Sequence, residues 1–158
     1  MSRPVDLLGP KSDAVRGAQL LLQSKNRRSR RQFLAEGPQA VNAALAAGLV
    51  QHLYVTEDLA DEYKKSGADR IYLVTDAGLR AISETEHPSG IVAVVNQPDV
   101  SLESVTSNAK ILVAAEISDP GNLGTMIRTA AACGYDYVIT TSGSTDMWSG
   151  KVVRSTAG

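Results

Sequence analysis

The feature that most restricts the fold is an alternation of short apolar runs with segments whose apolar residues recur every three or four positions. Segment 13–23 has this helical spacing, and Pro38 after Gly37 is typical of the first turn of another helix. Alternating strands and helices pack as an α/β layer, so we expect a largely parallel sheet in this part of the chain. The expected strands are 32–36, 50–56, 71–74 and 91–95.

A second unit of the same kind follows residues 96–108, whose serines and Pro98 are typical of a linker. The continuous apolar run 111–115 predicts a strand buried on both faces. Two strands and fewer than two full helices cannot cover both faces of a parallel sheet, so either the chain is a fragment or another chain completes the unit. The expected divisions are an N-terminal extension 1–11, a domain 12–95, a linker 96–109 and an incomplete domain 110–158. The expected elements of the second unit are a helix 122–133, a strand 137–140 and a helix 148–156.

Composition narrows the class of protein. Hydrophobic residues make up 43% and charged residues 21% of the chain, as in ordinary folded domains. With Cys133 as the one cysteine and two histidines, an internal disulfide is excluded and a zinc cluster is not expected. Aromatic residues are 4%, which argues against an RNA-binding platform of several stacked rings. No membrane span and no secretory signal are visible, so we expect a cytoplasmic protein without membrane contact.

Charge is unevenly distributed, although the net charge is −1. Residues 1–31 contain eight Lys and Arg against two acidic residues, whereas residues 32–109 contain four against eleven. A basic N-terminal part on an acidic body favours a polyanionic partner, nucleic acid before membrane. The densest basic run is 25–31. From this run alone, contact with nucleic acid and a solvated basic face or tail are equally good interpretations.

The segment 117–130 carries the strongest local signal. Residues 119–121 form a turn after a strand, and Asn122 stands where the N-cap of a helix is expected. Gly124 would let a ligand or a strand approach the backbone closely. Arg128 borders the apolar stripe of this helix, so its guanidinium needs a carboxylate or an RNA phosphate as a partner. The alternative is a capped strand–helix unit in which Arg128 is tied to a local acid.

Four stretches of the chain form recognisable motifs. They are Asp119-Pro120-x-Asn122-x-Gly124-x-x-x-Arg128-Thr129-Ala130, the C-terminal stretch 146–158, Arg31-x-Phe33-x-x-Glu36-Gly37, and the run 87–93. In order and spacing they resemble the SpoU (TrmH-like) branch of the SPOUT methyltransferases, over about residues 12–158. The first two are similar to the first and second motifs of the methyltransferase domain, and the other two resemble the RNA substrate-binding domain.

The resemblance implies an α/β protein with a small ribosomal-protein-like α/β substrate-binding domain, followed by the first part of an α/β-knot methyltransferase domain. It implies 2′-O-methylation of ribose in rRNA or tRNA with S-adenosylmethionine, and a homodimer. It places Asn122 and Arg128 in the catalytic region. Because arginine is a poor base, we favour Arg128 as the group that holds a phosphate and stabilises the developing oxyanion, with direct deprotonation as the second choice. The RNA contacts expected are Arg27, Arg28, Arg30, Arg31, Glu36, Lys151 and Arg154.

The chain departs from the family pattern in two places. Ser149 and Gly150 stand where family members often have Asn-Pro, which we expect to loosen the start of that helix. The third motif, which supplies most of the cofactor-binding loops, is not reached before Gly158. The chain therefore resembles a C-terminally truncated member that lacks the S-adenosylmethionine pocket. A non-catalytic RNA-binding protein or fragment is the alternative.

Overall fold

The computed structural model describes residues 7–157. The chain divides into two compact units, a first unit that ends at Gln97 and a second unit, Pro98–Ala157. Of the expected N-terminal extension, residues 1–6 lie outside the described residues, and Leu8 forms a parallel bridge with Val74. None of the described helices is long and apolar enough to cross a membrane.

The first unit is built on a four-stranded sheet. Its strands are β1 (Gln32–Glu36), β2 (Val50–Val55), β3 (Arg70–Leu73) and β4 (Ile91–Asn96), in the spatial order β1-β4-β2-β3. All four expected strands are present, but the expectation of a largely parallel sheet is wrong. Only β2 and β3 pair in parallel, whereas β4 lies between β1 and β2 and is antiparallel to both. The helical crossovers do keep β1, β2 and β3 in one direction, and the return strand β4 then separates β1 from β2.

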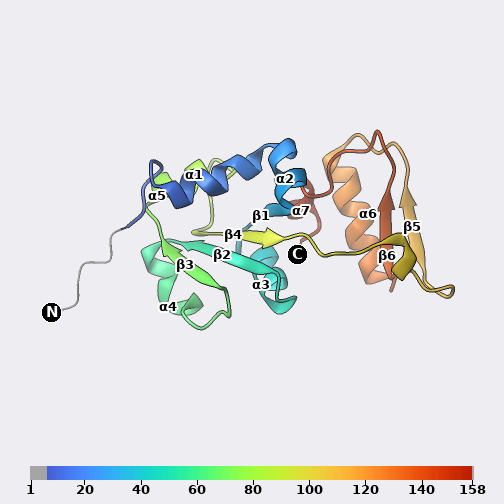
Figure 1. The fold of residues 1–158 in the computed structure, drawn as a ribbon, viewed down its shortest axis with the longest axis horizontal. Helices are drawn as coiled ribbons and strands as arrows, with labels where there is room; N and C mark the ends of the chain where they lie inside the picture. Colours follow the sequence, from blue (N-terminus) through green and yellow to red (C-terminus); the bar gives the residue numbers. More distant parts are fainter. Residues whose placement is uncertain (1–6, 158) are drawn as a thin grey trace. The chain divides into compact units, whose positions relative to one another are not determined.

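Helices cover both faces of this sheet (Figure 1). The α1 and α2 side is closed by a cluster of buried side chains that includes Val15, Leu21, Leu34 and Tyr54. The helices are α1 (Asp13–Gln19), η1 (Leu20–Leu22), α2 (Ser24–Arg30), α3 (Pro38–Ala46), η2 (Glu57–Leu59), α4 (Ala60–Tyr63) and α5 (Asp76–Ala81). After β2 the chain forms two short helical pieces, η2 and α4, which follow each other directly.

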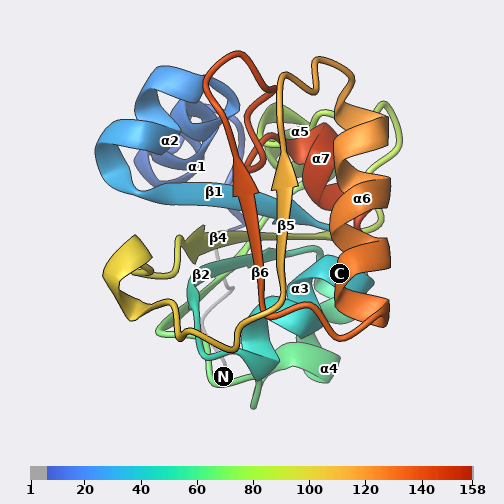
Figure 2. The ribbon, with the colours of Figure 1, turned by 90° about the vertical axis from the view of Figure 1, so that its right-hand side faces the viewer.

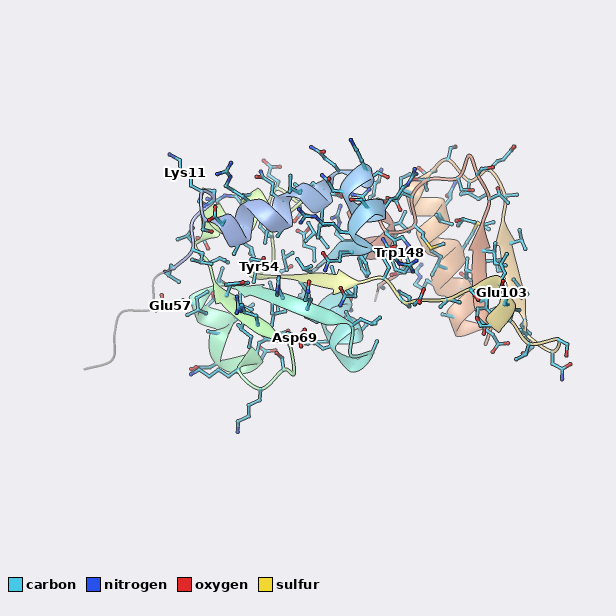
Figure 3. All side chains as sticks on the ribbon, viewed as in Figure 1. Lys11, Tyr54, Glu57, Asp69, Glu103 and Trp148 are labelled. Carbon is cyan, nitrogen blue, oxygen red and sulfur yellow. The ribbon has the colours of Figure 1, made fainter. Side chains whose placement is uncertain are left out.

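Tyr54 ties helix α1 to the sheet. Its ring is fully buried on β2, and its hydroxyl donates a hydrogen bond to the Ala14 carbonyl oxygen at 3.0 Å. Burial raises the pKa of Tyr54 to about 12, so the hydroxyl keeps its proton and its role as a donor. Figure 3 shows Tyr54 on the sheet beneath α1. This contact fixes the position of α1, and with it the start of the basic segment that follows.

The described part of the second unit contains two parallel strands, one long helix and one short α-helix. Strands β5 (Ile111–Ala114) and β6 (Tyr137–Thr140) run side by side in the same direction, with α6 (Pro120–Ala132) alongside (Figure 2). Helix α7 (Gly150–Ser155) packs on α6, and a short 3₁₀ turn, η3 (Leu102–Ser104), precedes β5. Its small core joins Ala114, Leu123 and Val152.

The expectation that the first strand of this unit is buried on both faces is wrong for the chain described. Ala114 is fully buried, but the side chains of Ile111 and Val113 are 37% and 57% exposed. These two residues alternate with Leu112 and Ala114, so they share the face that α6 and α7 do not cover. One face of the β5–β6 pair is therefore apolar and open.

Candidate functional site

The start of α6 is fixed by an aspartate. The side chain of Asp119 is the N-cap, since its Oδ1 accepts a hydrogen bond from the Asn122 backbone N–H at 2.7 Å, and Pro120 opens the helix. The expectation that Asn122 is the N-cap is therefore wrong. Asn122 is the third helical residue, and its exposed side chain is free of this capping role.

Arg128 is the second residue expected in the catalytic region. Its side chain is exposed, and no hydrogen bond or ion pair joins it to any other residue between 7 and 157, so the alternative of a tie to a local acid does not apply there. Asn122 and Arg128 are six residues apart on α6, which separates them by about 9 Å along the axis and about 120° around it. The helix therefore does not bring them onto one face, and a substrate would have to reach both.

The loops after β5 and β6 are joined at the carboxyl ends of the two strands. The Glu116 N–H donates to Thr141 Oγ1 at 3.1 Å, the Ile117 N–H donates to Ser144 Oγ at 3.1 Å, and the Thr145 N–H donates to the Ile117 carbonyl at 2.8 Å. Parallel α/β sheets bind ligands at this edge. Sequence reasoning missed these loops as part of the site, although polar residues directly after two strands are a usable signal.

The start of helix α7 has a side-chain cap. Ser149 is its N-cap, and its Oγ accepts from the Val152 N–H at 3.5 Å, so the serine at this position does not leave the helix start uncapped. Lys151 is exposed and Arg154 is half-buried. They are three residues apart, which places them on the same side of this short helix.

Gly124 has a packing role that differs from the expected one. A Cβ built on Gly124 would lie 2.3 Å from Ser155 Cβ and 2.9 Å from the Val152 carbonyl oxygen. The neighbour that needs the space is therefore helix α7, not a ligand or a strand. This contact holds α7, with Lys151 and Arg154, against the first turns of α6.

The basic run 25–31 forms a packed helix, α2, instead of a tail. Within it, Arg27 is only 5% exposed and its Nη1 donates to the carbonyl oxygens of Leu21 and Leu22 at 2.8 and 2.9 Å. These bonds satisfy the end of η1. The expectation that Arg27 contacts RNA does not fit this burial, because its guanidinium already binds backbone carbonyls inside the unit.

The neighbours of Arg27 lie on the surface. Arg28, Arg30 and Arg31 are all exposed. Arg28 makes no hydrogen bond or ion pair with the described part of the chain, while Arg30 Nη1 donates to the Gly17 carbonyl at 3.1 Å. Arg31 ends the helix in the left-handed region, with φ 51°. The three side chains thus present positive charge at one end of the first unit.

Glu36 holds a loop. Its Oε1 accepts hydrogen bonds from the hydroxyls of Ser83 and Thr85, and its Oε2 accepts from the Glu84 N–H at 3.3 Å. Both carboxylate oxygens are therefore engaged in fixing the segment between α5 and β4. Contact of Glu36 with RNA stays a prediction, beside this structural role.

The residues present do not fit S-adenosylmethionine by themselves. The joined loops after β5 and β6 bond to each other, and the outer face of β5 is open, with Val113 57% exposed. Enclosing a cofactor requires walls on more than one side. Between residues 7 and 157, no group of three or more His, Cys, Asp or Glu side chains is placed to hold a metal ion.

Comparison with known protein families gives two matches, in order along the chain. Residues 13–93 match the MRM3-like substrate binding domain, and residues 109–158 match the SpoU rRNA Methylase family. The first match alone covers more than half of the chain.

The chain belongs to the SpoU rRNA methylase family.

Relatives and solved structures agree with this family. The chain is 34% identical over 149 residues to the Bacillus subtilis 23S rRNA (guanosine(2553)-2′-O)-methyltransferase RlmP, a match that covers 94% of this chain and 59% of RlmP. It is 30% identical to the human mitochondrial rRNA methyltransferase 3, over 80% of this chain and 32% of that protein.

Solved SpoU-type structures share the fold. The AdoMet-bound rRNA methyltransferase from Sinorhizobium meliloti matches with a TM-score of 0.82 at 27% identity, over 97% of this chain and 60% of that chain. The SpoU methyltransferase AviRb from Streptomyces viridochromogenes, in complex with AdoMet, matches with a TM-score of 0.79 at 28% identity, over 94% of this chain and 60% of that chain. These matches confirm the expected family and α/β fold class, and the chain spans about three fifths of these SpoU proteins.

Proposed function

We propose that this chain is part of an enzyme that methylates the 2′-hydroxyl of a ribose in rRNA, with S-adenosylmethionine as the methyl donor. The proposal rests on one observation above all: a substrate-binding domain and a SpoU methylase segment follow each other in one chain, in the order of the rRNA methyltransferase relatives. The first unit would bind RNA and the second would contribute to the reacting site. By the family resemblance, we also propose a homodimer in the cytoplasm, which sedimentation and cell fractionation would test.

The chemistry gives Arg128 a role. A ribose hydroxyl is a weak acid and must lose its proton as the new C–O bond forms, so a positive group near the oxygen lowers the barrier. The Arg128 guanidinium is exposed and has no partner among the residues described, so it is available for such a contact. Arginine keeps its charge at neutral pH, and we propose that it holds the substrate phosphate and stabilises the oxyanion. Lys151 and Arg154 on α7 would add phosphate contacts.

The exposed arginines of the first unit would bind RNA phosphates. A protein that neutralises RNA phosphates loses affinity as the salt concentration rises. The slope of the logarithm of the binding constant against the logarithm of the salt concentration is proportional to the number of phosphate contacts. We expect the change of Arg28, Arg30 and Arg31 to Ala to weaken RNA binding and to reduce the salt slope by roughly 0.7–0.9 per lost contact. A matched control changes Lys64, Lys65 and Arg80 to Ala, which alters the net charge equally away from α2. Equal slopes for the two triple variants would contradict an RNA role for α2.

The activity itself is tested by methyl transfer. The protein isolated from its native cells is incubated with labelled S-adenosylmethionine and unmodified rRNA, and the label is located on the ribose by digestion. Label in 2′-O-methylnucleotides is the expected result. The open β5 face favours one alternative, an RNA-binding protein without catalysis. RNA binding without any transfer of label would support that alternative and reject the enzyme.

A further inference from the structure

A cavity of about 210 Å³ opens in the first unit between α1 and the sheet, at the end where β1, β2 and β3 begin. No role in the proposed methylation accounts for it. Its size suits one flat ring system better than the larger pockets of drug-sized ligands. The polar and aromatic lining residues other than Asp13 are Arg30, Gln32, Gln51, His52, Tyr54 and Tyr72.

One corner of the cavity is aromatic. The rings of His52 and Tyr72 stand nearly at right angles, with centroids 5.6 Å apart, and Tyr72 stacks on the buried Tyr54 at 5.1 Å. Because Tyr54 is anchored to α1, this stack is fixed in place before any ligand arrives. Low aromatic content argued against a base-binding surface, but the fold gathers two of the five tyrosines and one of the two histidines at this point.

The charge state of His52 suits contact with a neutral ring. Burial lowers the pKa of the His52 imidazole most, and the positive charge of Arg70 lowers it further. The negative charge of Asp69 acts in the opposite direction and raises this pKa. The imidazole is therefore neutral at neutral pH, with one donor and one acceptor nitrogen. Arg70 also lies over the Tyr72 ring, 5.9 Å from its centroid, and donates to the Tyr72 hydroxyl.

Side-chain amides provide a polar edge beside the rings. Gln32 Nε2 donates to Gln51 Oε1 at 2.5 Å and to Asn96 Oδ1 at 3.0 Å. These bonds orient the amides and leave Gln32 Oε1 and Gln51 Nε2 without a partner within residues 7–157. An acceptor and a donor side by side match the hydrogen-bonding edge of a nucleobase.

The rim of the cavity carries a positively charged side chain, as expected for a site that binds one nucleotide of an RNA strand. Arg30 is held at the cavity by its bond to the Gly17 carbonyl, and it follows Arg28 on the exposed side of α2. A phosphate backbone running along α2 would thus deliver a base to the cavity. Asp13 is the acidic residue in the lining, and it can accept a hydrogen bond from a base N–H but would repel a phosphate. The cavity therefore suits a base, with the phosphates outside it.

We propose that this cavity binds one unstacked nucleobase of single-stranded RNA, packed against His52 and Tyr72 with its polar edge toward Gln32 and Gln51. This inference rests on the proposed function only in taking RNA as the substrate. It adds a base-contacting site in the first unit, remote in sequence from Asn122 and Arg128.

The test compares two probes on the same chain at constant salt: an eight-nucleotide oligouridine and a ribose-phosphate oligomer of the same length without bases. Base stacking on an aromatic ring contributes at least ~1 kcal/mol, so the oligouridine should bind about fivefold or more tightly. His52→Ala and Gln51→Ala should each shrink this ratio. The matched controls His87→Ala and Gln39→Ala, which change exposed residues outside the cavity, should preserve it.

Each outcome decides between the two proposals. Equal affinity of the unaltered chain for both probes overturns the base site and leaves RNA binding intact. Binding of neither probe rejects RNA as the ligand of the first unit, and the base site with it. If His52→Ala fails to fold, the ring protons of the two histidines in the unaltered chain are followed by NMR during oligouridine titration. Shifts at His52 and not at His87 support the site, and the reverse overturns it.

Discussion

Two neighbouring arginines on one helix have opposite environments. Arg27 is buried and bonds to the carbonyls of Leu21 and Leu22, whereas Arg28 is exposed and unpaired with the described residues. Nothing in the run 25–31 distinguishes them beforehand, because a run of charged residues has no apolar stripe to mark its inner face. The buried one is selected by the carbonyls at the end of η1, a feature that only the folded backbone supplies.

Replacement of these two arginines by methionine should separate stability from RNA binding. Arg27→Met leaves the buried Leu21 carbonyl and the partly buried Leu22 carbonyl without their donor, so we expect the free energy of unfolding to fall by about 1–3 kcal/mol. Arg28→Met should change it by less than ~0.5 kcal/mol but weaken RNA binding. Urea unfolding and RNA titration of both variants make the comparison. A stable Arg27→Met variant with weakened RNA affinity would contradict the assignment of Arg27 as structural.

Arg128→Lys keeps one positive charge but loses the planar guanidinium fork. In the active enzyme we expect the single-turnover rate on saturating RNA to fall by ~10²-fold or more, in the range found for lost transition-state donors. Cofactor affinity, measured separately by calorimetry, should stay within a factor of two or so, as expected for a group that contacts only the RNA. A near-normal single-turnover rate would show that Arg128 takes no part in the chemical step.

At the scale of elements, the α6–α7 contact depends on the missing side chain of Gly124. A methyl group there would overlap Ser155 Cβ at 2.3 Å and press on the backbone of α7. Gly124→Ala improves helix propensity but should still destabilise the second unit by about 1–3 kcal/mol, the usual cost of overpacking. Gly17→Ala in α1 is a suitable control, because a Cβ there meets nothing within 4 Å. Hydrogen exchange of the α7 amides would register the loss, and equal protection in the two variants would contradict the packing role.

The sequence predicted where the strands lie better than how they pair. Each strand is a short apolar run, and local pattern is enough to place it, as at 32–36 and 137–140. Strand direction depends on a distant partner. No feature within 91–95 indicates that this strand runs against its neighbours and enters between β1 and β2. The same reasoning explains the shifted cap of α6, where Asp119 and Asn122 are both good capping residues and only the turn geometry decides.

At the scale of the whole molecule, the family and the order of its domains were accessible from motifs, because motif residues are close in sequence. The base-sized cavity was not, since His52, Tyr72 and Gln32 come from three strands that are far apart in the chain. The low aromatic content of the chain even argued against a site that binds bases by stacking. A low count of aromatic residues says little when the fold concentrates them at one end of a sheet.

The chain as described should not bind S-adenosylmethionine measurably. One side of the β5–β6 pair is open, and the loops at its carboxyl ends bond to each other, so no enclosed site awaits the cofactor there. Calorimetric titration with S-adenosylmethionine at up to millimolar concentration should give only heats of dilution. A saturable heat at micromolar concentration would contradict this expectation and show that the first two motifs suffice for binding.

The place of β4 in the first sheet has a consequence for synthesis on the ribosome. Strand β1 bonds to β4 alone, through pairs from Gln32 with Asn96 to Glu36 with Val92, so its partner is made some sixty residues later. While β4 is still inside the ribosome, strand β1 of the nascent chain has no partner strand, and the core of the first unit is incomplete. Contacts so distant in sequence slow folding, because a long loop must close before they form. Folding of the first unit should therefore be completed late, after Ile91–Asn96 has left the exit tunnel.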